Sequence, residues 1–269
     1  MAITLDSALL DDLAGRISGR VCAPRTTGTT QRAGSTNGLV DRTPAVIIRC
    51  RSATDVAAGV RFARAAGLDI TVRGGGHNVA GRAVADDAVM IDLAEMKGTE
   101  VDAEAHTVRA EGGLTWAELN GATAEHGLAV TGGVISSTGI SGLTLGGGLG
   151  WLMARHGLAA DNLLAVELVN AAGEVLDVTE TSDPDLFWAL RGGGGNFGIA
   201  TTFTYRLHPL EMVTGGLIAH PVDSAPDLLR FYRDAVADCL RRPDRIRCAG
   251  ARSGRVGHED LCPGRVPRR

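Results

Sequence analysis

The most informative stretch of this chain is Val72-Arg73-Gly74-Gly75-Gly76-His77-Asn78. Three consecutive glycines lack Cβ atoms, so the backbone can adopt positive φ and bring several N–H groups close to one ligand. Such a nest suits a phosphate, and Arg73 beside it can add a planar, permanently charged donor. A phosphate loop does not need His77, so its imidazole predicts a reactive nitrogen beside a phosphate-bearing cofactor. A plain turn is the alternative. We expect a side chain at Gly75 to fill the nest and oppose positive φ there.

The composition is that of a globular protein with an apolar core. Of 269 residues, 44% are hydrophobic, only 4% are aromatic, and 37 are glycine. Scarce aromatic side chains and a net charge of −4 argue against nucleic acid as a partner, because single-strand binding uses stacked rings and a basic surface. The length allows one large domain or two small ones.

The cysteines have no metal-ligand spacing and no Cys-x-x-Cys pair. An odd, scattered set is typical of reduced thiols, so we expect a cytoplasmic protein. The N-terminus lacks the basic segment and apolar run of a signal peptide. No segment approaches the ~20 apolar residues of a membrane span, so no membrane partner is expected. The cysteines are Cys22, Cys50, Cys239, Cys248 and Cys262.

Apolar runs and helix caps predict an ordered domain from Pro44 onward. Ser52-Ala53-Thr54-Asp55 predicts a helix start, and Gly67 predicts its end. Residues 131–150 read as a long loop with a short helix, and its apolar content argues against disorder. The predicted strands are residues 45–49, 70–72, 89–93, 100–102, 107–110, 165–170, 175–178 and 199–207, and further helices are predicted at 7–18, 115–126 and 184–190. The aromatic residues expected in the core are Trp151, Phe187, Trp188 and Phe197.

The sequence pattern changes after Pro209. A strand is predicted at residues 217–220 and a helix at 226–240. From Arg241 the apolar periodicity ends and arginines outnumber acidic residues, which predicts a disordered basic tail over residues 241–269.

One short motif points to the wrong cofactor. Gly193-x-Gly195-x-x-Gly198 matches the dinucleotide fingerprint, which needs a strand before it and a helix after it. Here a helix is predicted before it and a strand after it. The context therefore excludes a nicotinamide-binding Rossmann domain.

Several motifs follow one another in a fixed order, at residues 73–78, 138–152, 156–162, 185–198 and 206–209. This order resembles the FAD domain of the vanillyl-alcohol-oxidase type, and within it the bacterial berberine-bridge-enzyme-like oxidases. The resemblance covers about residues 46–210. It implies an α+β fold: a two-subdomain PCMH-type FAD-binding domain at 44–209, with 1–43 as its N-terminal segment and 210–240 as the beginning of a substrate-binding α+β domain.

By this resemblance, FAD lies extended across the domain, with residues 73–78 at its pyrophosphate. His77 is then the residue linked covalently to the flavin 8α-methyl group, and Gly198-Ile199 approaches the adenine end. The residues implied to bind FAD are Arg73, Gly74, Gly75, Gly76, His77, Asn78, Thr138, Gly139, Gly142, Leu143, Gly146, Gly147, Gly148, Asp161, Asn162, Gly198 and Ile199.

The chain departs from the family pattern in two places. Many members carry a second flavin link through a cysteine before the Gly142 segment, but residues 131–138 contain none, so a single link through His77 is expected. The family also continues past this point with a segment that carries a catalytic Tyr motif. Tyr205 and Tyr232 do not lie in such a motif, so no catalytic base is assigned.

Two functions follow. The first is an FAD-dependent oxidase that takes hydride from a small organic substrate (alcohol, sugar, amine or secondary metabolite) onto flavin N5 and is reoxidised by dioxygen. The alternative is a truncated, non-catalytic fragment that binds FAD.

Overall fold

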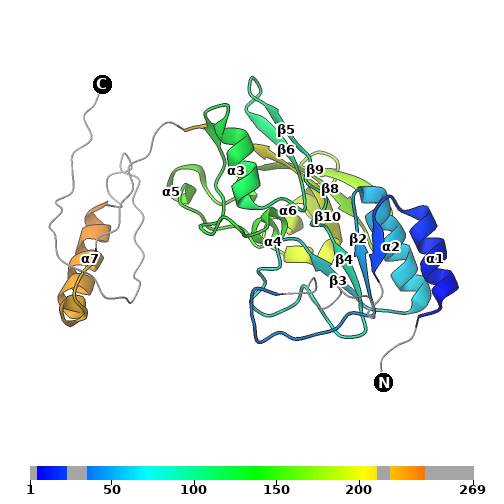
Figure 1. Ribbon diagram of the computed structural model, residues 1–269. Helices are drawn as coiled ribbons and strands as arrows, with labels where there is room; N and C mark the ends of the chain where they lie inside the picture. Colours follow the sequence, from blue (N-terminus) through cyan, green and yellow to red (C-terminus); the bar gives the residue numbers. More distant parts are fainter. Residues whose placement is uncertain (1–4, 23–34, 211–218, 240–269) are drawn as a thin grey trace. The chain divides into compact units, whose positions relative to one another are not determined.

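The computed structural model describes residues 5–22, 35–210 and 219–239 (Figure 1). The chain divides into two compact units, Met1–Leu210 and Glu211–Arg269. The first unit contains two main sheets with helices packed against them, so the predicted α+β class is confirmed.

The first sheet carries the glycine loop at the end of one strand. Its order is β1-β2-β4-β3, with β2 and β3 parallel to β4 and β1 antiparallel to β2. Three of its strands confirm the prediction. β1 lies before Pro44, where no strand was predicted, because three residues give too short a pattern to recognise. The strands are β1 (Arg20–Cys22), β2 (Val46–Arg49), β3 (Ile70–Arg73) and β4 (Val89–Asp92).

Helix α2 (Ala53–Ala66) contacts both main sheets and fixes one against the other. It begins and ends as predicted: the Ser52 hydroxyl accepts a helix N–H at 3.2 Å, and Gly67 follows with φ 64°. In one apolar cluster, Val56 of α2 joins Ile91 of the first sheet and Val169 of the second. Helix α1 (Ser7–Arg16) packs beside α2 (Figure 1).

The second sheet is antiparallel, with the order β5-β6-β10-β8-β9. Its middle strand, β10, begins directly after the glycine cluster at residues 192–198, here called the third cluster. Helices α3, α4 and α6 contribute to its apolar core. The strands are β5 (Thr99–Asp102), β6 (Thr107–Glu111), β8 (Leu163–Val169), β9 (Val175–Thr179) and β10 (Ile199–Arg206). The helices are α3 (Trp116–Ala124), α4 (Ile140–Leu145) and α6 (Pro184–Leu190).

Smaller elements complete the first unit. Strands β7 (Leu128–Ala129) and β11 (His208–Pro209) pair, and α5 (Met153–His156) follows the second glycine segment, residues 138–148. Short 3-10 helices lie at Ala160–Asn162 and Gly194–Phe197.

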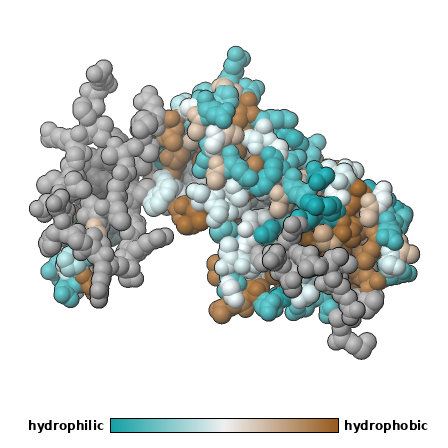
Figure 2. All heavy atoms as spheres, in the orientation of Figure 1, coloured by the Kyte–Doolittle hydropathy of each residue, from teal (hydrophilic) through white to brown (hydrophobic). Residues whose placement is uncertain are grey.

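The predicted aromatic core is only partly correct. Phe187 is buried, but Trp188, Trp151 and Phe197 are 73%, 52% and 40% exposed. Neighbours on a helix point to different sides, so α6 can bury only one of Phe187 and Trp188. Exposed apolar residues also gather around α5 on the visible face of the first unit (Figure 2). The largest fully buried aromatic side chains are Trp116, Tyr205 and Phe203.

The second unit contains a 3-10 turn at Val222–Ser224 and helix α7 (Ala225–Cys239), which confirms the predicted helix at 226–240. Of the strand predicted at 217–220, the last two residues are irregular, and the first two lie outside the described residues, as does the predicted basic tail. In the described parts of the chain, no helix has the length and apolar character needed to cross a membrane.

Candidate functional site

The glycine loop leaves the end of β3 and is held from two sides. The carbonyl of Gly76 accepts hydrogen bonds from the N–H and the hydroxyl of Thr36, each at 3.1 Å. Asn78 accepts the N–H of Arg82 on its side-chain oxygen at 3.0 Å. The Gly76 carbonyl is therefore already engaged, whereas within residues 5–22, 35–210 and 219–239 no acceptor is bonded to the N–H groups of residues 74–78. Donors that are held in place but not used are what an anion needs.

The loop meets the second glycine segment backbone to backbone. A Cβ built on Gly75 would lie 2.3 Å from the Gly139 nitrogen and 2.7 Å from its Cα. A Cβ built on Gly139 would meet the Gly75 nitrogen at 2.4 Å. The structure thus brings residues 73–78 and 138–148 together, as predicted. The expectation of positive φ at Gly75 was wrong, since that conformation belongs to Gly76, with φ 72°.

His77 meets the second segment through its side chain. Its Nε2 lies 3.1 Å from the hydroxyl oxygen of Ser137. The imidazole is half-buried, and Ser137 is exposed. Sequence reasoning did not single out Ser137, because sixty residues separate it from His77 and a tertiary contact, that of Gly75 with Gly139, brings their segments together.

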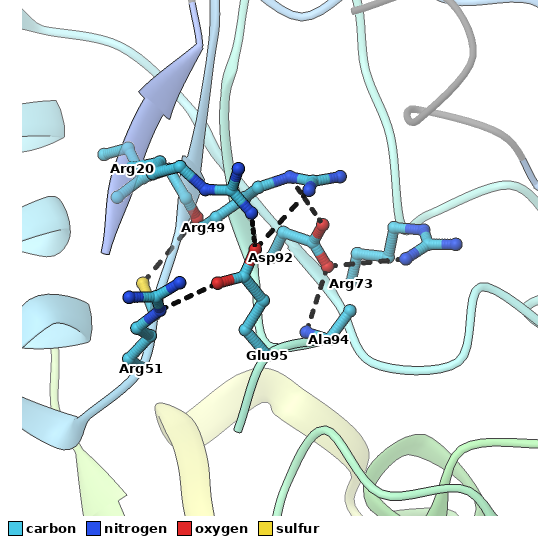
Figure 3. A network of polar contacts seen from close by, with 9 residues as sticks. Arg20, Arg49, Arg51, Arg73, Asp92, Ala94 and Glu95 are labelled. Carbon is cyan, nitrogen blue, oxygen red and sulfur yellow. Dashed lines mark hydrogen bonds and ion pairs between the residues drawn. The ribbon is translucent and has the colours of Figure 1, made fainter. Parts of the chain in front are cut away.

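Arg73 turns toward the sheet and forms an ion pair. Its Nη1 atom lies 3.4 Å from Asp92 on the neighbouring strand, and its buried Nε has no hydrogen-bond partner among the described residues. Asp92 also faces Arg49, with 3.8 Å between the charged atoms. Figure 3 shows this cluster at the carboxyl ends of three parallel strands. The Arg73 guanidinium, which was predicted to bind a phosphate, is therefore paired with the buried carboxylate of Asp92.

A second carboxylate, Glu95, completes the cluster. It pairs with Arg20, Arg49 and Arg51 (Figure 3). Burial alone would raise the pKa of Glu95, but the hydrogen bonds from Arg20 and Arg51 hold it below its ordinary value. Four arginines surround two carboxylates, so the cluster keeps an excess of positive charge.

In the second glycine segment, some glycines are required by the backbone and others leave open space. Gly147 and Gly148 have φ 104° and 82°, and a Cβ on Gly148 would meet Ala159 at 2.5 Å. Gly142 and Gly146 are exposed, and a Cβ on Gly142 would have nothing within 4 Å. Thr138 and Leu143 are half-buried. Two glycines four residues apart therefore leave one face of α4 bare.

Asp161 and Asn162 are engaged within their own loop. Asp161 accepts the Leu158 N–H at 2.8 Å. Asn162 is buried and donates to the carbonyls of His156 and Leu158, while its side-chain oxygen lies 2.6 Å from His208 Nε2. These side chains shape the loop after the second glycine segment, so their predicted contact with a cofactor stays a prediction.

The rings of His156 and His208 are half-buried and stack with their centroids 3.9 Å apart. Burial, and then the charge of Arg155, lowers the pKa of His156. Burial also lowers the pKa of His208, with further contributions from His156, Arg206, Arg155 and His106.

We expect this stack to make the fold acid-sensitive. A histidine whose pKa is lowered on folding binds fewer protons in the folded state, so stability is highest above the ordinary value of about 6.5 and falls as the pH drops through it. His208→Gln keeps a donor for Asn162 but does not titrate. The loss of melting temperature between pH 7.5 and 5.5 should be smaller in this variant than in the parent. His126→Gln, at an exposed site, should behave as the parent, and an equal loss in all three proteins would contradict this role.

The third cluster leads into β10. Gly198 has φ 151°, and a Cβ there would meet the Val169 carbonyl oxygen at 2.5 Å. Ile199 packs, 7% exposed, in the cluster that holds α2. The 3-10 turn before it contacts α4, so all three glycine clusters converge on or near α4. In the part of the chain that the structure describes, no group of three or more His, Cys, Asp or Glu residues could hold a metal ion.

The comparisons with known proteins agree with this geometry. The family described as "FAD binding domain" matches residues 44–179, slightly more than half of the chain. The chain belongs to this FAD-binding family. It is 38% identical over 223 residues to (R)-6-hydroxynicotine oxidase of Paenarthrobacter nicotinovorans, covering 82% of this chain and 49% of that protein.

Solved structures place the fold in the predicted superfamily. The crystal structure of 6-hydroxy-D-nicotine oxidase from Arthrobacter nicotinovorans matches with TM-score 0.79 and 38% identity, covering 82% of this chain and 50% of that one. Physcomitrella patens BBE-like 1 matches with TM-score 0.71 and 28% identity, covering 74% and 44%. The predicted berberine-bridge-like FAD domain is confirmed, and the relatives that this chain matches include FAD-linked oxidoreductases. The chain spans about half the length of the curated relatives it matches.

Proposed function

We propose that this chain binds FAD between the glycine loop and the bare face of α4, and that His77 is its single covalent link. The N–H groups of residues 74–78, which bond to no acceptor in the described part of the chain, carry this proposal, since a buried pyrophosphate needs donors that are still free to bind it. Gly142 and Gly146 leave room for a bulky group beside those donors. Residues 73–78 and 138–148 would hold the cofactor, and Gly198-Ile199 would lie toward its adenine end.

FAD, when bound, supplies the redox chemistry: it accepts hydride from a small organic substrate and passes the electrons to dioxygen. The oxidase names of the relatives support this reaction class. This chain's own residues position the cofactor. Tyr205 is buried against Thr144, at 2.8 Å between hydroxyl oxygens, and burial raises its pKa, so it is not placed to act as a base.

Because no base is assigned, cofactor binding and turnover are separate proposals. The alternative is that the 269-residue chain binds FAD without oxidising a substrate. Anaerobic mixing with candidate alcohols and amines decides between them: bleaching of the flavin absorbance supports the oxidase, whereas bound flavin that stays oxidised with every substrate supports the alternative.

We expect His77→Ala to lose all covalently held flavin. In the parent protein, yellow colour should stay with the polypeptide after acid denaturation, and the intact mass should rise by that of the flavin. His126→Ala, at an exposed histidine outside the site, should keep the link. Acid-stable flavin in His77→Ala would show that another residue forms the bond.

Gly142→Ala tests the proposed FAD site on α4 without disturbing the fold. A helix-interior alanine in open space should leave the apoprotein as stable as the parent, or more stable by up to about 1 kcal/mol. If FAD packs on this face of α4, the added methyl should weaken noncovalent binding about tenfold, as an overpacked contact of 1–3 kcal/mol predicts. Binding is measured by flavin fluorescence in a His77→Ala background. Gly121→Ala in α3, also in open space, is the control; equal affinity in both would remove α4 from the site.

A further inference from the structure

His77 has two ring nitrogens, and the structure treats them differently. Nε2 lies 3.1 Å from the Ser137 hydroxyl oxygen. Nδ1 is bonded to no group in residues 5–22, 35–210 and 219–239. A neutral imidazole carries its proton on one nitrogen and a lone pair on the other, and the partner of one nitrogen decides which. Only the nitrogen with the lone pair can form a new bond to carbon.

Ser137 sits on a rigid support. The carbonyls of its neighbours Ser136 and Thr138 accept the N–H groups of Ala117 and Trp116 in the first turn of α3, at 2.9 and 3.0 Å. The start of α3 is fixed in turn by a reciprocal capping box, and the Gly75–Gly139 contact fixes the His77 loop against the same segment. The distance between Ser137 and His77 is therefore set by backbone contacts on both sides.

Resting on the proposed function, we infer that Ser137 is a positioning residue for flavin attachment. Its hydroxyl accepts the Nε2–H of His77, which leaves the lone pair on Nδ1 and selects Nδ1 as the nitrogen that bonds to flavin. As Nδ1 bonds to carbon, the ring becomes positively charged, and the hydrogen bond from Nε2–H to Ser137 strengthens because its donor is now ionised. Ser137 thus both selects the nitrogen and stabilises the charged product.

The attachment step balances as an oxidation. The Nδ1–C bond forms at the flavin 8α-methyl group, one methyl C–H bond breaks, and the imidazole loses its proton after attachment. Two electrons and two protons leave in total. Dioxygen, the oxidant of the proposed reaction, accepts them and becomes hydrogen peroxide.

The test follows flavin attachment in apoprotein mixed with FAD and air. The parent, Ser137→Ala, Ser137→Thr and Ser136→Ala are compared by the fraction of flavin that survives denaturation over time. The bonded nitrogen is identified by NMR of the isolated flavin peptide. Noncovalent FAD affinity and circular dichroism show that each variant is folded and loaded.

We expect the parent, Ser137→Thr and Ser136→Ala to attach flavin through Nδ1 only. Ser137→Ala should attach it about tenfold more slowly, equivalent to 1.4 kcal/mol, and give a mixture of Nδ1 and Nε2 products. A structural role would lower loading without changing the nitrogen. Attachment through Nε2 in the parent, or an unchanged rate and product in Ser137→Ala, overturns the inference and leaves the proposed link intact. No covalent flavin in the parent overturns both.

Discussion

A valine at position 75 should abolish FAD binding. Its Cβ would begin 2.3 Å from the Gly139 nitrogen, a backbone atom that cannot rotate away. The Gly139 segment is held as well, because the Ile140 N–H bonds to the Leu114 carbonyl at 2.9 Å. The two glycine segments must separate, which pulls apart the pyrophosphate donors and α4. FAD titration followed by fluorescence should show no saturable binding, and the folded state should lose several kcal/mol.

Two further variants test the same contact. Gly139→Val meets the same contact from the other side, with its Cβ 2.4 Å from the Gly75 nitrogen, and should give the same loss. Gly121→Ala adds a side chain in open space and should bind FAD as the parent does. A folded Gly75→Val protein with unaltered FAD affinity would exclude this loop from the site.

The distinction between Gly75 and Gly76 shows where sequence reasoning stops. Consecutive glycines predict a loop with special backbone, because only glycine accepts both positive φ and close approach. They do not indicate which glycine adopts positive φ and which one makes the close approach. Gly76 uses positive φ and Gly75 uses the missing Cβ, and that assignment depends on Gly139, sixty-four residues away. Local pattern predicts the loop, and tertiary contact decides the role of each glycine.

The same limit applies to the secondary structure and to the site. Strands β2 to β4 and helix α2 could be predicted because apolar runs and caps are local signals. β1 and β7 could not, since each is too short for a periodicity. Ser137 and Asp92 act through residues distant in sequence, and nothing next to either one marks it.

Removing the charge of Asp92 should destabilise the first unit more than removing that of Glu95. Asp92 is 1% exposed, ends the central parallel strand, and separates Arg49 from Arg73 in the register of the sheet. Asp92→Asn keeps the shape of the side chain but removes the carboxylate that pairs with Arg49 and Arg73, so Arg73 loses this counter-ion while Arg49 keeps Glu95 at 3.5 Å. Breaking such a pair costs about 3 kcal/mol, or roughly 6–12 °C in melting temperature for a unit of this size.

Glu95→Gln is the matched control, because it lies in the same cluster but pairs chiefly with the half-exposed Arg20 and Arg51. Exposed pairs contribute at most about 1 kcal/mol, so this variant should melt within a few degrees of the parent. Arg73 leads directly into the glycine loop, and its guanidinium is held by Asp92 at 3.4 Å. At a temperature where both variants are folded, Asp92→Asn should therefore bind FAD more weakly than Glu95→Gln. Equal melting temperatures and equal FAD affinities would mean that Asp92 does not brace the end of β3.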